Sequence, residues 1–244
     1  MERADWLKQM RSKAEALYDQ FSPLYWVTYG FYENETHMEY LQKFLERVAP
    51  GGAVLSAGCG AGRYDGFLLD AGHPVTGIDQ SAGMLARAKE HFTQIRYEKM
   101  GMQEMTFSEA FEGVICMDAM EHISPEDYAY ILRKFQQALK PGGRLYFTMD
   151  STPSVELEAS YERAKALGLP VVFGEVADRV DVSYEQLRAL GPVPVPDDLG
   201  DSAVYHFYPS LDQARAWIDQ AGLALEEEGE GGGYHHFMAR KKEE

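Results

Sequence analysis

The sequence predicts an α/β fold, in which a mostly parallel β-sheet carries helices on both faces. Short apolar runs alternate with helix-period stretches from residue 53 onward, and this alternation is typical of parallel sheets. A glycine-rich turn, "GCGAG" at 58–62, directly follows the first apolar run, as in many strand-to-helix ligand loops. The chain of 244 residues is long enough for one such domain with a small lid.

The predicted strands are short apolar runs bounded by turn residues, at 53–57, 74–78, 94–98, 112–117, 143–149, 223–228 and 234–240. The clearest predicted helix covers 125–139. Ser124 is its expected N-cap, Pro125 its first residue, and "PGG" at 141–143 its stop signal. A second helix is predicted at 211–221, where Ser210 and Gln213 fit a capping box.

Two segments break this rhythm, residues 1–45 before the first strand and residues 151–205 after the fifth. The second contains Pro192, Pro194 and Pro196, which exclude both a helix and a central strand there. Ligands of open parallel sheets bind at the carboxyl ends of the strands. We therefore expect one domain over 1–244, with 1–45 as a helical lid segment and 151–205 as an insertion forming a substrate lid.

Charge and composition exclude several classes of partner. With 23 basic and 39 acidic residues the net charge is −16, which disfavours nucleic acids and anionic membranes. No apolar run approaches the roughly 18 residues of a membrane span, and the first 21 residues resemble an amphipathic helix more than a signal peptide, so we expect a cytoplasmic protein. Cys59 and Cys116 cannot build a disulfide framework and lack metal-ligand spacing, so they are expected to be packing residues.

The glycine-rich turn is compatible with phosphate, dinucleotide or other nucleoside ligands. The phosphate-loop pattern requires Lys followed by Ser or Thr, and neither follows Gly62. The glycines are spaced G-x-G-x-G, which differs from the dinucleotide fingerprint G-x-G-x-x-G. Asp79 ends the second predicted strand, where a carboxylate can accept hydrogen bonds from both hydroxyls of a ribose. A nucleoside ligand is therefore the favoured interpretation.

Four segments in order, "VLSAGCGAGR", "GIDQSAGMLARAK", "FEGVICMDAMEHI" and "LKPGGRLYFTM", resemble the motif series of class I S-adenosylmethionine-dependent methyltransferases. The resemblance covers about residues 50–150 well. It implies a Rossmann-like, doubly wound sheet of seven strands with an antiparallel last strand. It also implies methyl transfer from S-adenosylmethionine to a small-molecule acceptor by in-line displacement, with S-adenosylhomocysteine as product.

The resemblance also implies a cofactor site at the carboxyl edge of the sheet. Its expected residues are Ser56, Ala57, Gly58, Cys59, Gly60, Gly62, Asp79, Gln80, Met84, Gly101, Met102, Gln103, Met117 and Asp118. Two of them depart from the family pattern. Ser56 stands where an acid usually lies near the methionine amino group, and Gly101 stands where an Asp commonly meets adenine. Because Ser56 can still accept a hydrogen bond, we predict a weakened or rearranged site that still binds.

His122 and Tyr25 are the candidate catalytic residues. A histidine after the fourth strand lies near the methyl group by family geometry and has a pKa suited to a general base, although it could instead bond to backbone at a helix entry. His206, His235 and His236 could form a metal site with His122, but His235 and His236 are adjacent on a strand and face opposite sides, so no metal is predicted.

Aromatic residues gather in both candidate lid segments, and they either pack the lid or line the substrate cavity. They are Tyr18, Phe21, Tyr25, Trp26, Tyr29, Phe31, Tyr32, Tyr205, Phe207 and Tyr208. The acidic run at 226–228 is expected to be a solvated strand edge.

Two other functions fit parts of the sequence. A catalytically degenerate sensor or partner subunit would keep the fold and account for Ser56 and Gly101. A nucleotide-dependent oxidoreductase is disfavoured by the glycine spacing. Neither the methyl acceptor nor the oligomeric state can be inferred from the sequence.

Overall fold

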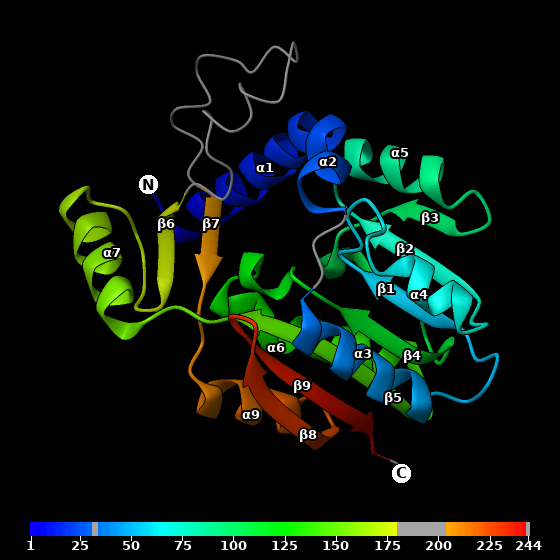
Figure 1. Ribbon diagram of the computed structural model, residues 1–244. Coiled ribbons are helices and arrows are strands. Elements are labelled where there is room, and N and C mark those ends of the chain that lie inside the picture. Colours follow the sequence, from blue (N-terminus) through cyan, green and yellow to red (C-terminus); the bar gives the residue numbers. More distant parts are fainter. Residues whose placement is uncertain (31–33, 180–203, 243–244) are drawn as a thin grey trace.

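A computed structural model describes residues 1–30, 34–179 and 204–242, and its centre is a seven-stranded sheet in the order β3-β2-β1-β4-β5-β9-β8 (Figure 1). The first five strands pair in parallel. β9 runs antiparallel to both of its neighbours, β5 and β8. The predicted doubly wound sheet with an antiparallel last strand is therefore confirmed.

All seven predicted strands are present, with bounds that shift by a few residues. They are β1 (Val54–Ala57), β2 (Val75–Asp79), β3 (Arg96–Lys99), β4 (Phe111–Cys116), β5 (Leu139–Asp150), β8 (Leu223–Gly231) and β9 (Tyr234–Lys241). β5 differs most, because Leu139 already pairs with Phe111 before the register shifts. The "PGG" segment therefore lies within the irregular start of β5 and does not separate the helix from the strand.

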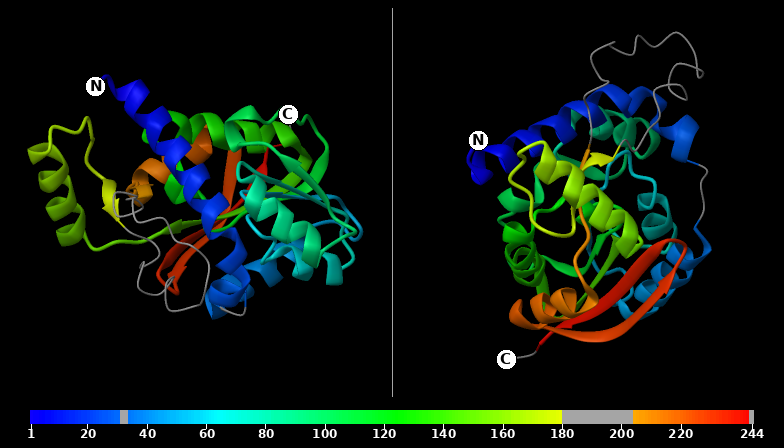
Figure 2. Two further views of the ribbon diagram at one scale, coloured as in Figure 1. Left: turned by 90° about the horizontal axis from the view of Figure 1, so that it is seen from above. Right: turned by 90° about the vertical axis from the view of Figure 1, so that its left-hand side faces the viewer.

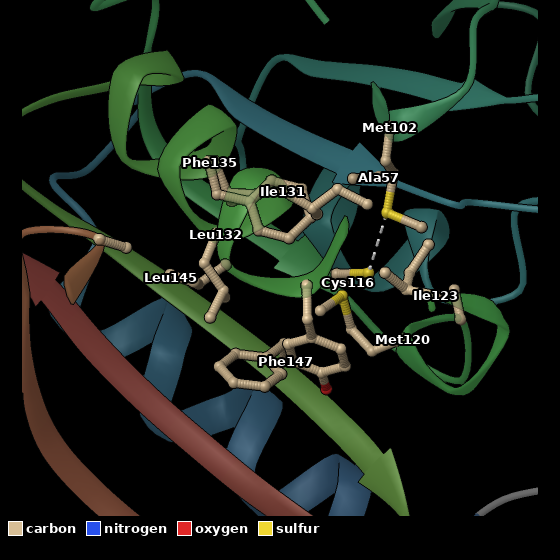
Figure 3. Close-up of a cluster of buried hydrophobic side chains, with 14 of the residues drawn as sticks. Ala57, Met102, Cys116, Met120, Ile123, Ile131, Leu132, Phe135, Leu145 and Phe147 are labelled. Carbon is tan, nitrogen blue, oxygen red and sulfur yellow. Dashed lines mark hydrogen bonds between the residues drawn. The ribbon is translucent and has the colours of Figure 1, made fainter. Parts of the chain in front are cut away.

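Helices cover both faces of the sheet. On one face, α3 (Glu35–Arg47), α4 (Asp65–Asp70) and α5 (Ala82–His91) share a core with the strands. On the other face, α6 (Pro125–Ala138) and α9 (Leu211–Gln220) do so. Figure 3 shows part of this second core, with Ile131, Leu132 and Phe135 of α6 against Leu145 and Phe147 of β5. The alternation of strands and helices in the sequence produces this three-layer arrangement.

Both predicted helix starts are found. Ser124 is the N-cap of α6 with Pro125 at the first position, although its side chain forms no capping hydrogen bond. At α9, Ser210 and Gln213 form the predicted capping box, with each side chain bonded to the other residue's backbone N–H. These caps set the start of the two helices that cover β4, β5 and the last strands.

The N-terminal segment divides into two parts with different positions. α1 (Arg3–Phe21), the 3₁₀ turn η1 (Ser22–Leu24) and α2 (Tyr25–Tyr29) cross the carboxyl edge of the parallel strands, as Figures 1 and 2 show. α3 instead packs on the face of the sheet through Leu41 and Phe44. Of the segment 1–45, residues 3–29 thus lie over the edge of the sheet and α3 lies on its face, and the expected lid role stays a prediction.

The insertion contains secondary structure that the sequence analysis did not predict. α7 (Ser154–Ala166) is followed by β6 (Glu175–Arg179), which pairs antiparallel with β7 (Val204–Phe207). α7 buries only Leu157, Ser160 and Ala164, so its apolar periodicity is too sparse to reveal a helix. Pro192, Pro194 and Pro196 lie outside the described residues.

None of the helices in the described ranges is both long and apolar enough to span a membrane.

Candidate active site

A cavity of about 800 Å³ lies at the carboxyl ends of β1, β2 and β4, under α1 and α2. This is within the size range of small-molecule and cofactor sites. It is lined by His122, by Tyr25 and by every expected cofactor residue except Gly62. Gly62 instead forms part of the turn between β1 and α4, with φ of +81°. The structure thus brings the expected residues to one place, and their individual roles stay predictions.

The glycine-rich loop needs two of its glycines for backbone conformation and close approach. Gly58 and Gly60 have φ of +64° and +54°, in the left-handed region that side chains disfavour. A Cβ at Gly58 would lie 2.7 Å from the Cβ of Ala119. The Gly60 N–H donates to Asp79 Oδ2 at 2.8 Å, so the loop is fastened to the end of β2. Both glycines therefore keep backbone exposed to the cavity.

Asp79 is held in place by backbone groups and fits a ribose partner. Its Oδ1 accepts the Ser81 N–H at 2.8 Å and its Oδ2 accepts the Gly60 N–H. Burial raises the pKa of Asp79, and these two backbone hydrogen bonds oppose that rise. Each carboxylate oxygen has a second lone pair, so Asp79 can accept two hydroxyl groups in addition.

The structure explains the glycine at position 101. A Cβ at Gly101 would overlap the guanidinium of Arg11 and the carboxylate of Glu104. These two groups form an ion pair between α1 and the 3₁₀ turn η2 (Met102–Glu104), with 2.6 Å between Arg11 Nη2 and Glu104 Oε2. The space that a family aspartate would occupy is thus taken by the lid helix. Met84 and Met102 nearby give the cavity apolar walls suited to a flat base.

Ser56 lies close to a carboxyl group that the sequence analysis missed. Asp65, in the first turn of α4, lines the cavity and is 1% exposed. Its Oδ2 accepts the hydroxyl of Tyr97 from β3 at 2.9 Å. Burial raises the pKa of Asp65 to about 6, and hydrogen bonding from Ser56 and Tyr97 limits the rise. An acid three residues after the last loop glycine was the only sequence signal.

Asp118 is at the centre of a polar network after β4. Its φ of +52° is uncommon for a residue other than glycine. Oδ1 accepts His37 Nε2–H at 2.7 Å, and Oδ2 accepts the Tyr64 hydroxyl at 2.8 Å and the Arg63 guanidinium. Burial opposes ionisation, but His37 and Arg63 outweigh it and lower the pKa of Asp118. His37 comes from α3, so no local sequence pattern could have linked it to this site.

His122, in the 3₁₀ turn η3 (Met120–His122), has a tautomer that its neighbours define. Its Nδ1 lies 3.3 Å from the carbonyl oxygen of Tyr205, which can only accept, so Nδ1 carries the proton. Nε2 is then the acceptor for the Tyr18 hydroxyl at 3.0 Å. The backbone bond expected as the alternative role of His122 does exist, but to β7, and it leaves Nε2 as a potential base. Tyr18 is a second site residue whose pairing the sequence did not reveal.

The other histidines do not gather around His122 as a metal site would require. The ring of His206 lies 4.7 Å from that of His122, whereas His236 bonds to the Tyr146 hydroxyl at 3.0 Å, within the sheet layer. Within the described part of the chain, no group of three or more His, Cys, Asp or Glu side chains could hold a metal ion. Cys59 and Cys116 are free thiols, and burial raises the pKa of both.

Several of the predicted aromatics line the cavity, namely Tyr18, Phe21, Tyr25, Tyr29 and Tyr205. Burial raises the pKa of Tyr25 to about 12, so its phenol keeps its proton at neutral pH. Trp26 instead packs on the ring of His91, and Phe207 and Tyr208 belong to buried clusters. Phe31 and Tyr32 lie outside the described residues.

Comparisons with known proteins agree with this geometry. Residues 54–143 match a family model described as a methyltransferase domain. The chain is 28% identical over 204 residues to a ubiquinone biosynthesis O-methyltransferase of Xanthomonas axonopodis pv. citri, covering 80% of this chain and 71% of that protein. A protein of the same name from Hydrogenovibrio crunogenus is 31% identical over 121 residues, covering 47% of this chain and 48% of that protein.

Solved structures share the fold at low sequence identity. A methyltransferase from Methanosarcina mazei superposes with a TM-score of 0.64 at 15% identity, covering 82% of this chain and 96% of its own. A 1,6-didemethyltoxoflavin-N1-methyltransferase from Burkholderia thailandensis gives a TM-score of 0.57 at 16% identity, and the match covers 99% of this chain and 87% of that chain. The matched residues 54–143 contain the glycine-rich loop, Asp79 and Asp118. Residues 54–143 thus form a methyltransferase domain, and the whole chain has the fold of solved S-adenosylmethionine-dependent methyltransferases.

Proposed function

We propose that this enzyme methylates an oxygen atom of a small aromatic acceptor bound beneath α1 and α2. The observation that carries the proposal is His122, whose Nε2 is left as a hydrogen-bond acceptor at the wall of an aromatic-lined cavity. The named relatives are O-methyltransferases, which supports oxygen as the accepting atom. The Burkholderia neighbour is named as an N1-methyltransferase of 1,6-didemethyltoxoflavin, which supports a small molecule as the acceptor. A cavity of about 800 Å³ has room for a cofactor and a compact acceptor.

The cofactor would lie along the carboxyl edge of the sheet. Asp79 would accept hydrogen bonds from the ribose hydroxyls, and the loop at 58–62 would support the methionine end. Met84 and Met102 would contact the two faces of adenine, beside Gly101 and Gln103. The remaining expected cofactor residues, Ser56, Ala57, Cys59, Gln80, Met117 and Asp118, line the same cavity and would complete its wall.

The acceptor side would be organised by His122 and its two neighbours. Bound S-adenosylmethionine supplies a methyl group on a sulfonium, which leaves as S-adenosylhomocysteine. As the new oxygen–carbon bond forms, the acceptor hydroxyl would pass its proton to the Tyr18 hydroxyl oxygen, and Tyr18 would pass its own proton to His122 Nε2, to which it already donates at 3.0 Å. The Tyr205 carbonyl would then stabilise the protonated ring through Nδ1–H, as an orienting group does in other acid–base pairs.

Tyr25 would act as a hydrogen-bond donor to the acceptor. Its raised pKa, to about 12, makes it a poor base at neutral pH but leaves a phenol proton available. The ring of Phe21 packs edge-on against Tyr25 and Tyr29, with centroid distances of 6.0 and 5.8 Å, and the rings of Tyr25 and Tyr29 lie tilted at 5.6 Å. This packing would hold the aromatic wall in place and favour flat acceptors.

The test separates cofactor binding from proton transfer. Calorimetry measures S-adenosylhomocysteine binding to the wild type, Asp79→Ala and His122→Asn. Mass spectrometry then follows methylation of a panel of small phenols and catechols. We expect Asp79→Ala to lose binding. We expect His122→Asn to bind normally but to lose about 10²–10⁴-fold in kcat, the usual contribution of a general base.

Two results would contradict the proposal. No binding of S-adenosylhomocysteine to the wild type at millimolar concentration would remove the proposed cofactor site. Equal methylation rates for the wild type and His122→Asn would leave the cofactor site standing but exclude His122 as the base.

A further inference from the structure

Three carboxylates line the cavity around the glycine-rich loop, and they differ in how well they are already bonded. Asp79 accepts a backbone N–H on each oxygen. Asp118 accepts His37 on one oxygen and Tyr64 and Arg63 on the other. Asp65 accepts Tyr97 on Oδ2, whereas its buried Oδ1 receives no hydrogen bond of normal geometry from the described residues. Asp65 is therefore the one of the three with an oxygen that accepts no hydrogen bond of normal geometry from the described residues.

Among the residues that the structure describes, no cationic side chain pairs with Asp65. Its partners are the hydroxyls of Tyr97 on β3 and Ser56 on β1, and the thiol of Cys59 lies close by. A carboxylate buried among neutral groups is unfavourable until a positive group reaches it. Ser56 itself is buried, bonds to Asp65 and lines the same cavity at the end of β1. A cationic ligand group entering here would restore the balance of charge.

We propose that Asp65, from beneath the glycine-rich loop, is the carboxylate that receives the ammonium group at the amino-acid end of the cofactor. The inference rests on the proposed cofactor site and deepens it. It assigns to α4 the negative charge that Ser56 does not provide at the end of β1. The negative charge that the family usually places at the end of β1 is then supplied from α4, the next element of the chain. The ammonium group of the cofactor therefore still has a carboxylate partner.

The test compares two ligands that differ at this end. S-adenosylhomocysteine carries the amino-acid group, whereas 5′-methylthioadenosine has the same base, ribose and thioether without it. Calorimetry at pH 8 measures both ligands on the wild type and on Asp65→Asn, a neutral variant of the same shape. We expect Asp65→Asn to weaken S-adenosylhomocysteine by about 10- to 100-fold, the range of a charged hydrogen bond, and to leave 5′-methylthioadenosine within about twofold.

A second variant tests the relocation itself. Ser56→Asp combined with Asp65→Asn moves the charge back to β1 next to the same space. We expect this double variant to recover most of the lost S-adenosylhomocysteine affinity, with no change for 5′-methylthioadenosine. A merely structural role of Asp65 would give no such recovery.

Failure of this inference is distinguishable from failure of the proposed function. If Asp65→Asn weakens both ligands equally, or neither, Asp65 does not hold the ammonium group, although the cofactor site stands. If the wild type binds neither ligand, the proposed site itself is wrong and this inference falls with it.

Discussion

At the scale of one residue, the buried carboxyl group of Asp65 lowers the stability of the folded protein at neutral pH. Because burial raises the pKa of Asp65 to about 6 from an ordinary value of 3.8, the folded protein binds its proton more tightly than the unfolded chain. Stability contributed by this group therefore falls as pH rises from about 4 to about 6, and stays low above that. This rise in the pKa of Asp65 corresponds to a loss of about 3 kcal/mol in the free energy of unfolding between low and neutral pH.

Asp65→Asn should therefore stabilise the protein at pH 7.5 by roughly 1–3 kcal/mol, and the gain should shrink as pH falls towards 4. Urea unfolding of both proteins at pH 7.5 and pH 4.5 measures this difference. The groups that face Asp65 are Tyr97, Ser56 and Cys59, and none of them titrates in that range, so the pH dependence reports Asp65. A destabilised Asp65→Asn at pH 7.5 would contradict the argument.

The sequence predicted where residues were missing from the site but not what replaces them. Ser56 and Gly101 were recognisable as departures because the surrounding motifs fix their positions. The groups beside them, Asp65 and Arg11, belong to short or distant helices whose orientation depends on tertiary packing. The same holds for Tyr18, whose hydrogen bond to His122 joins residues 104 positions apart.

At the scale of elements, α1 is joined to several parts of the molecule and lines the cavity. Asp19 Oδ1 accepts the Ser81 hydroxyl at 2.6 Å and the Gly83 N–H at 2.8 Å, so it serves the N-terminus of α5. Arg3 at the other end pairs with Glu175 at 2.7 Å and with Glu126. A helix held at both ends in this way limits access to the ligand beneath it.

Gly83 permits the close approach of α1 to α5, and this gives a direct test. A Cβ at this position would lie 2.6 Å from Ser22 Oγ and 2.8 Å from the carbonyl oxygen of Asp19. Because the backbone carbonyl cannot rotate away, Gly83→Ala should push α1 outward. We expect faster hydrogen exchange in α1 and S-adenosylhomocysteine binding weakened by about tenfold or more, with core strands unaffected.

Lys89→Ala, on the exposed side of the same helix, is the matched control and should change neither measurement. Unchanged exchange in α1 of Gly83→Ala would show that α1 does not depend on this contact.

Helices and strands with a regular apolar pattern were predicted from the sequence, and those that bury few apolar side chains were not. α6 and α9 have full apolar faces and clear caps, so periodicity located them within a residue or two. α7 packs on β6 through a small cluster, Leu157, Val176 and Tyr208, and β6 also pairs with β7, but neither α7 nor β6 gave a readable period. The acidic run of β8 was expected to be a solvated edge, and its carboxylates there pair with cations such as Lys43, Arg144 and Arg215.

At the scale of the whole molecule, the topology could be predicted because the order of motifs determines the order of strands. The different positions of α1 and α3 could not be predicted, since both helices are amphipathic and only tertiary packing places α1 over the sheet edge and α3 on the sheet face. The consequence is a cavity whose walls come from residues as far apart as Arg3 and Tyr234. A ligand that filled this cavity would contact the sheet edge, the glycine-rich loop and α1 together.

Ligand binding should therefore stabilise the protein as one unit. A ligand at 100 times its Kd adds about 2.7 kcal/mol to the free energy of unfolding. For a domain of 244 residues this corresponds to a rise in Tm of about 5–10 °C. Differential scanning calorimetry with saturating S-adenosylhomocysteine should show this rise in a single transition, and Asp79→Ala should show none at the same concentration. Two separate transitions, with only the later one shifted, would mean that α1 melts independently of the sheet and does not share in ligand binding.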